Sequence, residues 1–110
     1  MKSSREEVEA ILKDLRIAFN NNKIIPIARD KNIKTLARLG ITWDIAKEEI
    51  STLTYSNYIK GPEIDYDRPK EDSFWIFKKV VQGEIIYIKF KVLYKHNSEV
   101  TLVSFHFDEV

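Results

Sequence analysis

Three runs of alternating apolar and polar residues in the last third of the chain constrain its fold most. Residues 74–81, 84–94 and 99–107 are rich in β-branched and aromatic side chains, as strands are. Gln82 and Gly83 lie between the first two runs and suit a two-residue hairpin turn, in which glycine takes a positive φ. Residues 95–98 form a second, looser turn. The sequence therefore predicts a three-stranded antiparallel meander.

The two turns set the register of this sheet. We pair Val81 with Glu84, and Tyr94 with Glu99. Because side chains alternate along a strand, one face then collects the apolar core. That core face carries Trp75, Phe77, Ile86, Ile88, Phe90, Phe105 and Phe107. The opposite face carries Ile76, Lys78, Tyr87, Lys89, Lys91, Ser104 and His106, with Tyr87 across from His106 and Lys89 across from Ser104.

The first half of the chain has helical periodicity. Residues 4–19 place apolar side chains at helical spacing, and Ser4 with Glu7 forms a capping box. A short β-branched run at residues 24–28 contains Pro26, which limits it to an edge strand. Asp30 or Asn32 begins a second helix that ends at Gly40.

A third helix and a long polar segment complete the pattern. Thr42 opens the helix, with Ile45, Ile50 and Leu53 expected to point inward. Residues 60–72 are polar, contain glycine and proline, and are expected to form a loop. Loops of this length are often functional.

These elements predict one α+β domain over residues 1–110. Three N-terminal helices pack on one face of a C-terminal antiparallel β-meander, with a short extra edge strand. At 44% hydrophobic residues the chain can build a core without disulfides or metal. It has no cysteine, which excludes thiolate metal sites, and we expect no cofactor. Residues 1–15 are charged throughout, unlike a signal peptide, so we expect a cytoplasmic protein without membrane contact.

The polar face of the sheet is the candidate site. A histidine is suited to proton transfer near neutral pH, and His106 lies opposite a phenol among lysines. Such a set suits phosphate chemistry. Each member also has an ordinary alternative: His106 as the end of a strand, Tyr87 as a packing residue, and the lysines as protection of strand edges against aggregation.

The polar segment adds two basic residues, Lys60 and Arg68, that suit phosphate contact. The net charge of +1 means that any basic site must be local. Alternating carboxylates at Glu63, Asp65 and Asp67 raise the alternative of a divalent cation site, but the prolines and basic neighbours favour a structural turn network.

Several strings in the sequence resemble a known protein family. They are Leu39-Gly40-Ile41, then Asn57-Tyr58-Ile59-Lys60-Gly61-Pro62-Glu63, then Asp65, Asp67, Arg68 and Pro69, then Tyr87-Ile88-Lys89 and Val103-Ser104-Phe105-His106. Together they resemble the MqsR family of toxins from bacterial type II toxin-antitoxin modules. The resemblance implies a fold akin to the RelE-like ribonuclease toxins, metal-independent cleavage of messenger RNA, and neutralisation by a cognate antitoxin.

The resemblance also implies roles for particular residues. The family's functional lysine falls on Lys60 and its active-site tyrosine on Tyr87. The family's glutamine falls on Ile76, which has no hydrogen-bonding side chain, and the terminal Ser-Phe-Lys of the best-known member reads Ser104-Phe105-His106 here.

From both lines we expect an endoribonuclease. His106 acts as general acid or base, Tyr87 holds or relays a proton at the phosphate, and Lys60 and Lys89 stabilise its charge. Further RNA contacts are expected from Arg68, Lys78, Lys91 and Tyr66. The alternative is a non-catalytic module of the same fold that binds RNA or protein, as the isoleucine at position 76 and the low net charge suggest.

Overall fold

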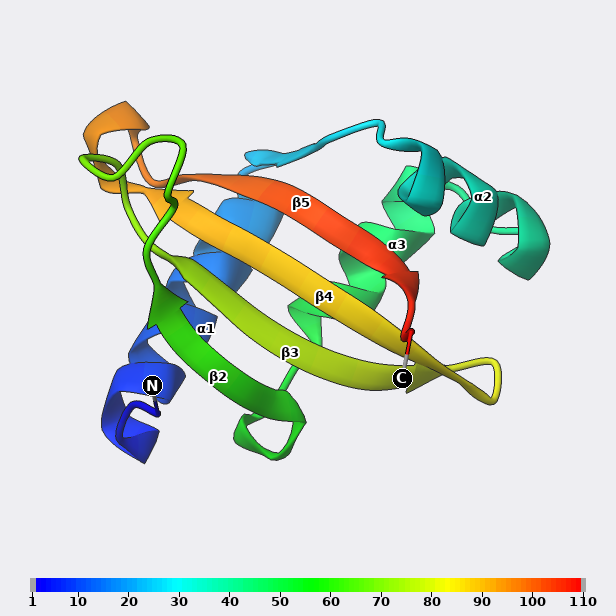
Figure 1. Cartoon of the computed structure of the whole chain (residues 1–110), viewed down its shortest axis with the longest axis horizontal. Coiled ribbons are helices and arrows are strands. Elements are labelled where there is room, and N and C mark those ends of the chain that lie inside the picture. Colours follow the sequence, from blue (N-terminus) through cyan, green and yellow to red (C-terminus); the bar gives the residue numbers. More distant parts are fainter. Residues whose placement is uncertain (1, 110) are drawn as a thin grey trace.

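The computed structural model describes residues 2–109, which form three α-helices and a five-stranded sheet. The elements in chain order are α1 (Arg5–Asn20), β1 (Ile24–Pro26), α2 (Asp30–Leu39), α3 (Trp43–Ser51), the 3-10 turn η1 (Tyr55–Asn57), β2 (Tyr58–Glu63), β3 (Phe74–Val81), β4 (Glu84–Leu93), the 3-10 turn η2 (Tyr94–His96) and β5 (Glu99–Phe107). The strand order is β1-β5-β4-β3-β2 (Figure 1). β1 runs parallel to β5 and the other neighbours are antiparallel. The predicted α+β class is confirmed, including the short strand at the edge.

Local capping signals position two of the helices as predicted. The Glu7 backbone N–H donates to Ser4 Oγ, and the Ser4 N–H donates to the Glu7 carboxylate, so the capping box of α1 is present. Thr42 caps α3 by accepting from the backbone N–H of Ile45. The inward assignment of Ile45 is wrong, because its side chain is 43% exposed and Ala46 is buried instead. The buried positions of α3 are Ala46 and Ile50, which are four residues apart and so lie on one face of the helix.

The start of α2 differs from the prediction. Arg29 is the N-cap residue and makes no capping bond with its side chain, whereas Asn32 lies inside the helix and is buried. Asn32 Oδ1 accepts from the Phe105 backbone N–H at 3.0 Å, and its Nδ2 donates to the Val103 carbonyl at 2.9 Å. The backbone groups at the free edge of β5 form these hydrogen bonds with the Asn32 side chain. A partner of this kind is long-range, so the local sequence does not reveal it.

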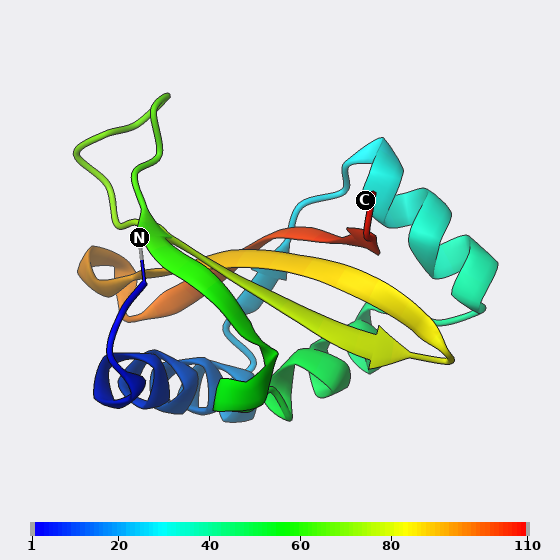
Figure 2. The same cartoon turned by 60° about the horizontal axis from the view of Figure 1, so that its bottom comes forward.

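Helix α2 therefore covers a sheet edge. Strand β1 pairs only with residues 100–102 of β5. Beyond that point Asn32 and Thr35 supply the missing hydrogen bonds, since Thr35 Oγ1 accepts from the Phe107 backbone N–H at 3.2 Å. Figure 2 shows α1 and α3 beneath the sheet and α2 above it, beside the end of β5. The face of the sheet away from α1 and α3 is called the open face below.

The core lies between the sheet and the two helices beneath it. Phe77, Phe90 and Phe105 are fully buried there, and the rings of Phe77 and Phe90 stack with centroids 5.5 Å apart. Burying such rings is among the largest single contributions to the stability of a small domain. The face predicted to be core is therefore the core.

The register of the first hairpin is as predicted. Val81 pairs with Glu84 and Trp75 with Phe90. Gln82 and Gly83 both have positive φ, at 51° and 79°, which is the conformation that a tight two-residue hairpin needs.

The second hairpin corrects one detail. Glu99 pairs with Leu93 rather than Tyr94, which belongs to η2. A register shift follows, because Lys89 pairs with Ser104 while Phe90 pairs with Leu102. The predicted pairing at the turn was wrong by one residue, and the extra residue in β5 restores the predicted register beyond it. Tyr87 consequently lies opposite His106, as predicted.

The segment expected to be a loop begins as a strand. Residues 58–63 form β2, which pairs with β3, and only the following residues form the loop. Gly61 has a φ of +136°, and a Cβ there would lie 3.0 Å from the Phe74 carbonyl oxygen, so only glycine fits against β3. Within residues 2–109, no helix is both long and apolar enough to cross a membrane.

Candidate functional site

Four strands bring mostly polar residues together on the open face in two rows. The first row runs across β3, β4 and β5 and consists of Lys78, Tyr87 and His106. The second row runs across β2 to β5 and consists of Lys60, Ile76, Lys89 and Ser104. The missed strand β2 is thus what places Lys60 beside the others. All four residues expected to be catalytic lie in these two rows.

Tyr87 and His106 form the centre of the first row. Their rings stack with centroids 5.3 Å apart and an angle of 18° between the planes. His106 Nδ1 lies 3.0 Å from the carbonyl oxygen of Phe107. A carbonyl oxygen only accepts hydrogen bonds, so Nδ1 carries the proton in this contact. The neutral ring then presents Nε2 as an acceptor, which is the form that a general base requires.

The environment of Tyr87 keeps its phenol protonated. Burial raises the pKa of Tyr87 above its ordinary value, and the nearby carboxylates of Glu63 and Asp108 act in the same direction. The ammonium groups of Lys60 and Lys78 oppose this shift without reversing it. Tyr87 is therefore a donor of a hydrogen bond or a proton near neutral pH, rather than a base.

The lysines of the open face differ in how far their charge is already neutralised. Lys78 Nζ lies 2.8 Å from the Asp108 carboxylate, and Lys60 Nζ lies 3.3 Å from the Glu63 carboxylate. Lys89 has no carboxylate partner in the part of the chain that the structure describes. Its ammonium lies 4.3 Å from the centre of the Phe74 ring. The charge of Lys89 is thus the most available of these lysines.

Lys91 has a different environment from the other lysines. It is only 5% exposed, and its Nζ lies 2.9 Å from both the Asp65 and the Glu71 carboxylates. Hydrogen bonding from Lys91 lowers the pKa of both carboxyl groups. Burial acts against the ammonium, but these hydrogen bonds outweigh it and raise the pKa of Lys91. Lys91 thus holds the loop on the sheet, and we do not propose it as an RNA contact.

The loop over residues 64–73 is an ordered turn network, as the prolines indicated. Asp65 Oδ1 accepts from the backbone N–H groups of Asp67 and Arg68. Arg68 pairs with Glu71 at 3.5 Å. Tyr66 is 89% exposed on this loop.

This geometry does not support the alternative of a cation site. Glu63 and Asp65 each face a lysine ammonium, at 3.3 and 2.9 Å. Among the described residues, no three histidine or carboxylate side chains gather in a way that could hold a metal ion.

Sequence reasoning missed Arg29. Its guanidinium reaches the open face, where Nη1 lies 3.4 Å from Ser104 Oγ. Arg29 borders a groove of about 480 Å³ that runs between the loop and the β4–β5 hairpin. Its only signal in the sequence is its place just after the edge strand, which puts it near β5.

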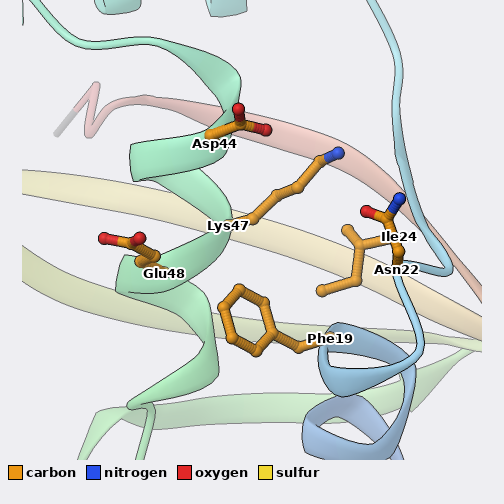
Figure 3. Close-up of a pocket in the computed structure, with 6 residues that line it drawn as sticks. All are labelled: Phe19, Asn22, Ile24, Asp44, Lys47 and Glu48. Atoms are coloured by element: carbon orange, nitrogen blue, oxygen red, sulfur yellow. The ribbon is translucent and has the colours of Figure 1, made fainter.

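A second hollow lies on the helical side of the molecule. It has a volume of about 280 Å³ and is lined by Phe19, Asn22, Ile24, Asp44, Lys47 and Glu48. Figure 3 shows Lys47 reaching across it towards Asn22, while Glu48 points away. No histidine or tyrosine lines this hollow, so the open face is the better candidate for proton-transfer chemistry.

Comparison of the chain with protein-family models, with curated proteins and with solved structures gave no match. The case for a function therefore rests on the open face and on the resemblance of the sequence strings.

Proposed function

We propose that this protein is a metal-independent endoribonuclease toxin of the MqsR type that cleaves messenger RNA. The observation that supports this best is the stacked pair of Tyr87 and His106 beside the unneutralised ammonium of Lys89. The family resemblance supplies the biological setting, in which a cognate antitoxin neutralises the enzyme.

RNA carries its own nucleophile, so few residues suffice for the reaction. His106 Nε2 takes the proton of the 2′-hydroxyl, and O2′ forms a bond to phosphorus. The bond from phosphorus to O5′ then breaks, and the protonated Tyr87 supplies the proton that O5′ needs. Exchange with solvent restores both side chains. The products are a 2′,3′-cyclic phosphate and a 5′-hydroxyl.

Charge stabilisation comes from the second row of the open face. Negative charge grows on the non-bridging oxygens as the phosphorane forms, and a fixed ammonium there lowers the barrier. Lys89 is the main donor, and Lys60 contributes once substrate competes with Glu63 for it. Lys78 and Arg68 contact flanking phosphates once substrate competes with Asp108 and Glu71 for them, and the exposed ring of Tyr66 stacks on a base.

One observation favours a second candidate, a non-catalytic module that binds RNA. Ile76 is 1% exposed and lies between Lys60 and Lys89, at the position where the family has glutamine. The site therefore lacks one hydrogen-bond donor at its centre. In this case the open face binds RNA and leaves it intact.

The decisive experiment incubates a labelled single-stranded RNA with the protein in excess EDTA. We expect cleavage to persist and the products to end in 2′,3′-cyclic phosphate. His106→Gln should slow cleavage by about a hundred- to ten-thousand-fold, the range for loss of a general acid or base. The matched control is His96→Gln in η2, which should cleave at the wild-type rate.

Two results would overturn the proposal. Activity that EDTA abolishes and magnesium or manganese restores would exclude the metal-independent route. RNA binding without any cleavage by the wild-type protein would favour the non-catalytic module. The antitoxin is tested separately, since co-expression of a neighbouring reading frame should relieve growth arrest caused by the wild-type protein.

A further inference from the structure

Arg29 and Lys89 lie on either side of one buried hydroxyl. Ser104 is directly opposite Lys89 in the sheet, and Arg29 Nη1 approaches Ser104 Oγ from the start of α2. Ser104 is only 2% exposed. Arg29 and Lys89 thus reach the open face from a helix start and from a strand, and both line the groove described above.

The charges of Arg29 and Lys89 are available to a ligand. In the groove next to them, Lys91 is neutralised by loop carboxylates and Arg68 pairs with Glu71. Of the remaining charged residues that line the groove, Arg29 and Lys89 are positive and Asp67 is negative. Neither Arg29 nor Lys89 forms an ion pair with any residue between 2 and 109. An anion bound there would meet two donors at once, one of them a planar guanidinium suited to phosphate.

The position of Arg29 and Lys89 relative to Tyr87 and His106 suggests which kind of anion binds there. Ser104 and His106 are two residues apart on one face of β5, which corresponds to about 6 to 7 Å along the strand. Lys89 and Tyr87 have the same separation on β4. A single RNA strand that lies along β4 and β5 would present its next phosphate one such step away. The groove, with Phe74 and Leu93 among its apolar lining residues, has room for the attached nucleoside.

We propose that Arg29, with Lys89, binds the phosphate next to the one that reacts, and that the groove holds that neighbouring nucleotide. This inference rests on the proposed function, in which Tyr87 and His106 act on the reacting phosphate. Lys89 lies between the two phosphates and contributes to both. Arg29 belongs to the second phosphate alone, which makes it a determinant of substrate length.

The test compares substrates with one and with two phosphates. The first is a dinucleoside monophosphate, and the second is a trinucleotide extended on either side in turn. Arg29→Ala should lower kcat/KM for one of the trinucleotides by about ten- to a hundred-fold, the effect of losing one charged hydrogen bond. Cleavage of the dinucleoside monophosphate should be unchanged. Arg29→Lys should recover part of the loss, because the charge returns without the planar donor group.

The matched control is Arg16→Ala on α1, which removes the same charge from the opposite side of the sheet. It should leave all three substrates unaffected. Equal losses from Arg29→Ala on the dinucleoside monophosphate and on the trinucleotides would place Arg29 at the reacting phosphate and overturn the proposal.

A binding measurement separates this inference from the proposed function. A fluorescent trinucleotide with 2′-O-methyl groups cannot be cleaved, so its affinity reports on the phosphate contacts alone. Arg29→Ala should weaken its binding by about ten- to a hundred-fold, whether or not the wild-type protein cleaves RNA. If His106→Gln cleaves normally and Arg29→Ala still weakens binding, the proposed function fails and the second phosphate site stands. If Arg29→Ala binds the probe as the wild type does, the second site is overturned.

Discussion

Phe105 and His106 are neighbours in β5 whose side chains serve opposite faces of the sheet. Phe105 is fully buried against the helices, whereas His106 is partly exposed beside Tyr87. We expect Phe105→Ala to lower the free energy of unfolding by about 3 to 5 kcal/mol, because it opens a cavity in a packed core. His106→Gln should cost about 1 kcal/mol, the scale of one stacked ring pair.

Urea denaturation of the two variants measures both values. The same proteins serve the cleavage assay, so stability and rate are separated at adjacent positions. A larger loss of stability in His106→Gln than in Phe105→Ala would contradict the assignment of the two faces.

Asn32 is the buried polar residue on which the position of α2 depends. Its amide pairs with the Ile27 and Val103 carbonyls and with the Phe105 backbone N–H. Asn32→Leu keeps the branched shape of the side chain but leaves these groups without partners, so we expect a loss of at least about 2 kcal/mol in the free energy of unfolding.

Thr35→Val is the matched control for Asn32→Leu. It keeps the shape of the side chain and removes the acceptor for a single N–H, that of Phe107, so a loss of about 1 kcal/mol is expected. Chemical denaturation compares the two variants. If Asn32→Leu is as stable as the wild type, the amide is not what fixes α2 to β5.

Prediction from sequence succeeded for residues whose partners are local. Ser4, Thr42 and Gly83 act within a few residues of themselves, and their roles follow from the types of residue nearby. Asn32 and Arg29 interact with β5, about 70 positions further along the chain. No local pattern specifies such partners.

At the scale of elements, β2 shows why the site was only partly predictable. Gly61 and Pro62 are unfavourable within strands, so residues 58–63 resembled a loop. The strand forms nevertheless, with register shifts on both sides of Lys60. The register shift in β5 could not be predicted from the sequence either. It changes which residues pair, but it leaves the alternation of apolar and polar residues in the preceding part of the strand unchanged.

The loop over residues 64–73 should be sensitive to acid. The pKa values of Asp65 and Glu71 lie below their ordinary values of 3.8 and 4.5 because Lys91 binds both carboxylates. A carboxyl with a lowered pKa in the folded state stabilises that state above its ordinary pKa and loses this contribution as the pH falls through the lowered value. The pKa of Lys91 is raised, so its contribution is lost only above about 10.5. Docking of the loop should therefore be constant near neutral pH and weaken below about pH 4.

Hydrogen exchange of the loop amides as a function of pH checks this expectation. Protection relative to the sheet should fall as the pH is lowered from 6 to 3. In Lys91→Met the loop should exchange fast at every pH, whereas Lys70→Met, a charge change on the same loop, should behave as the wild type. Loop protection that stays constant down to pH 3 would contradict the role of Lys91.

At the scale of the molecule, the order of the three helices, β1 and the three strands of the meander, and the division of the sheet into two faces, followed from periodicity and turn residues, whereas β2 was missed. Periodicity shows which side of an element is apolar but not which surface that side meets. Helix α2 illustrates the limit: its apolar residues Leu36 and Leu39 join the core, while its polar residues close the edge of β5.

The whole-molecule charge makes a last prediction about RNA binding. The net charge is +1, and on the open face the ammonium groups of Lys60, Lys78 and Lys91 are paired with carboxylates, so we expect any attraction for RNA to be local rather than global. For single strands the logarithm of the binding constant falls with the logarithm of salt concentration, with a slope of about −0.7 for each phosphate neutralised. Two or three contacts on the open face give a slope of about −1.4 to −2. Fluorescence anisotropy of a 2′-O-methyl oligonucleotide between about 50 and 200 mM salt measures this slope.

Arg29→Ala should reduce the slope by about 0.7, and Arg16→Ala should leave it unchanged. A slope near zero would show that the open face holds no phosphate, and a slope of −5 or steeper, on the order of seven contacts, would show that RNA covers far more of the surface than the two rows.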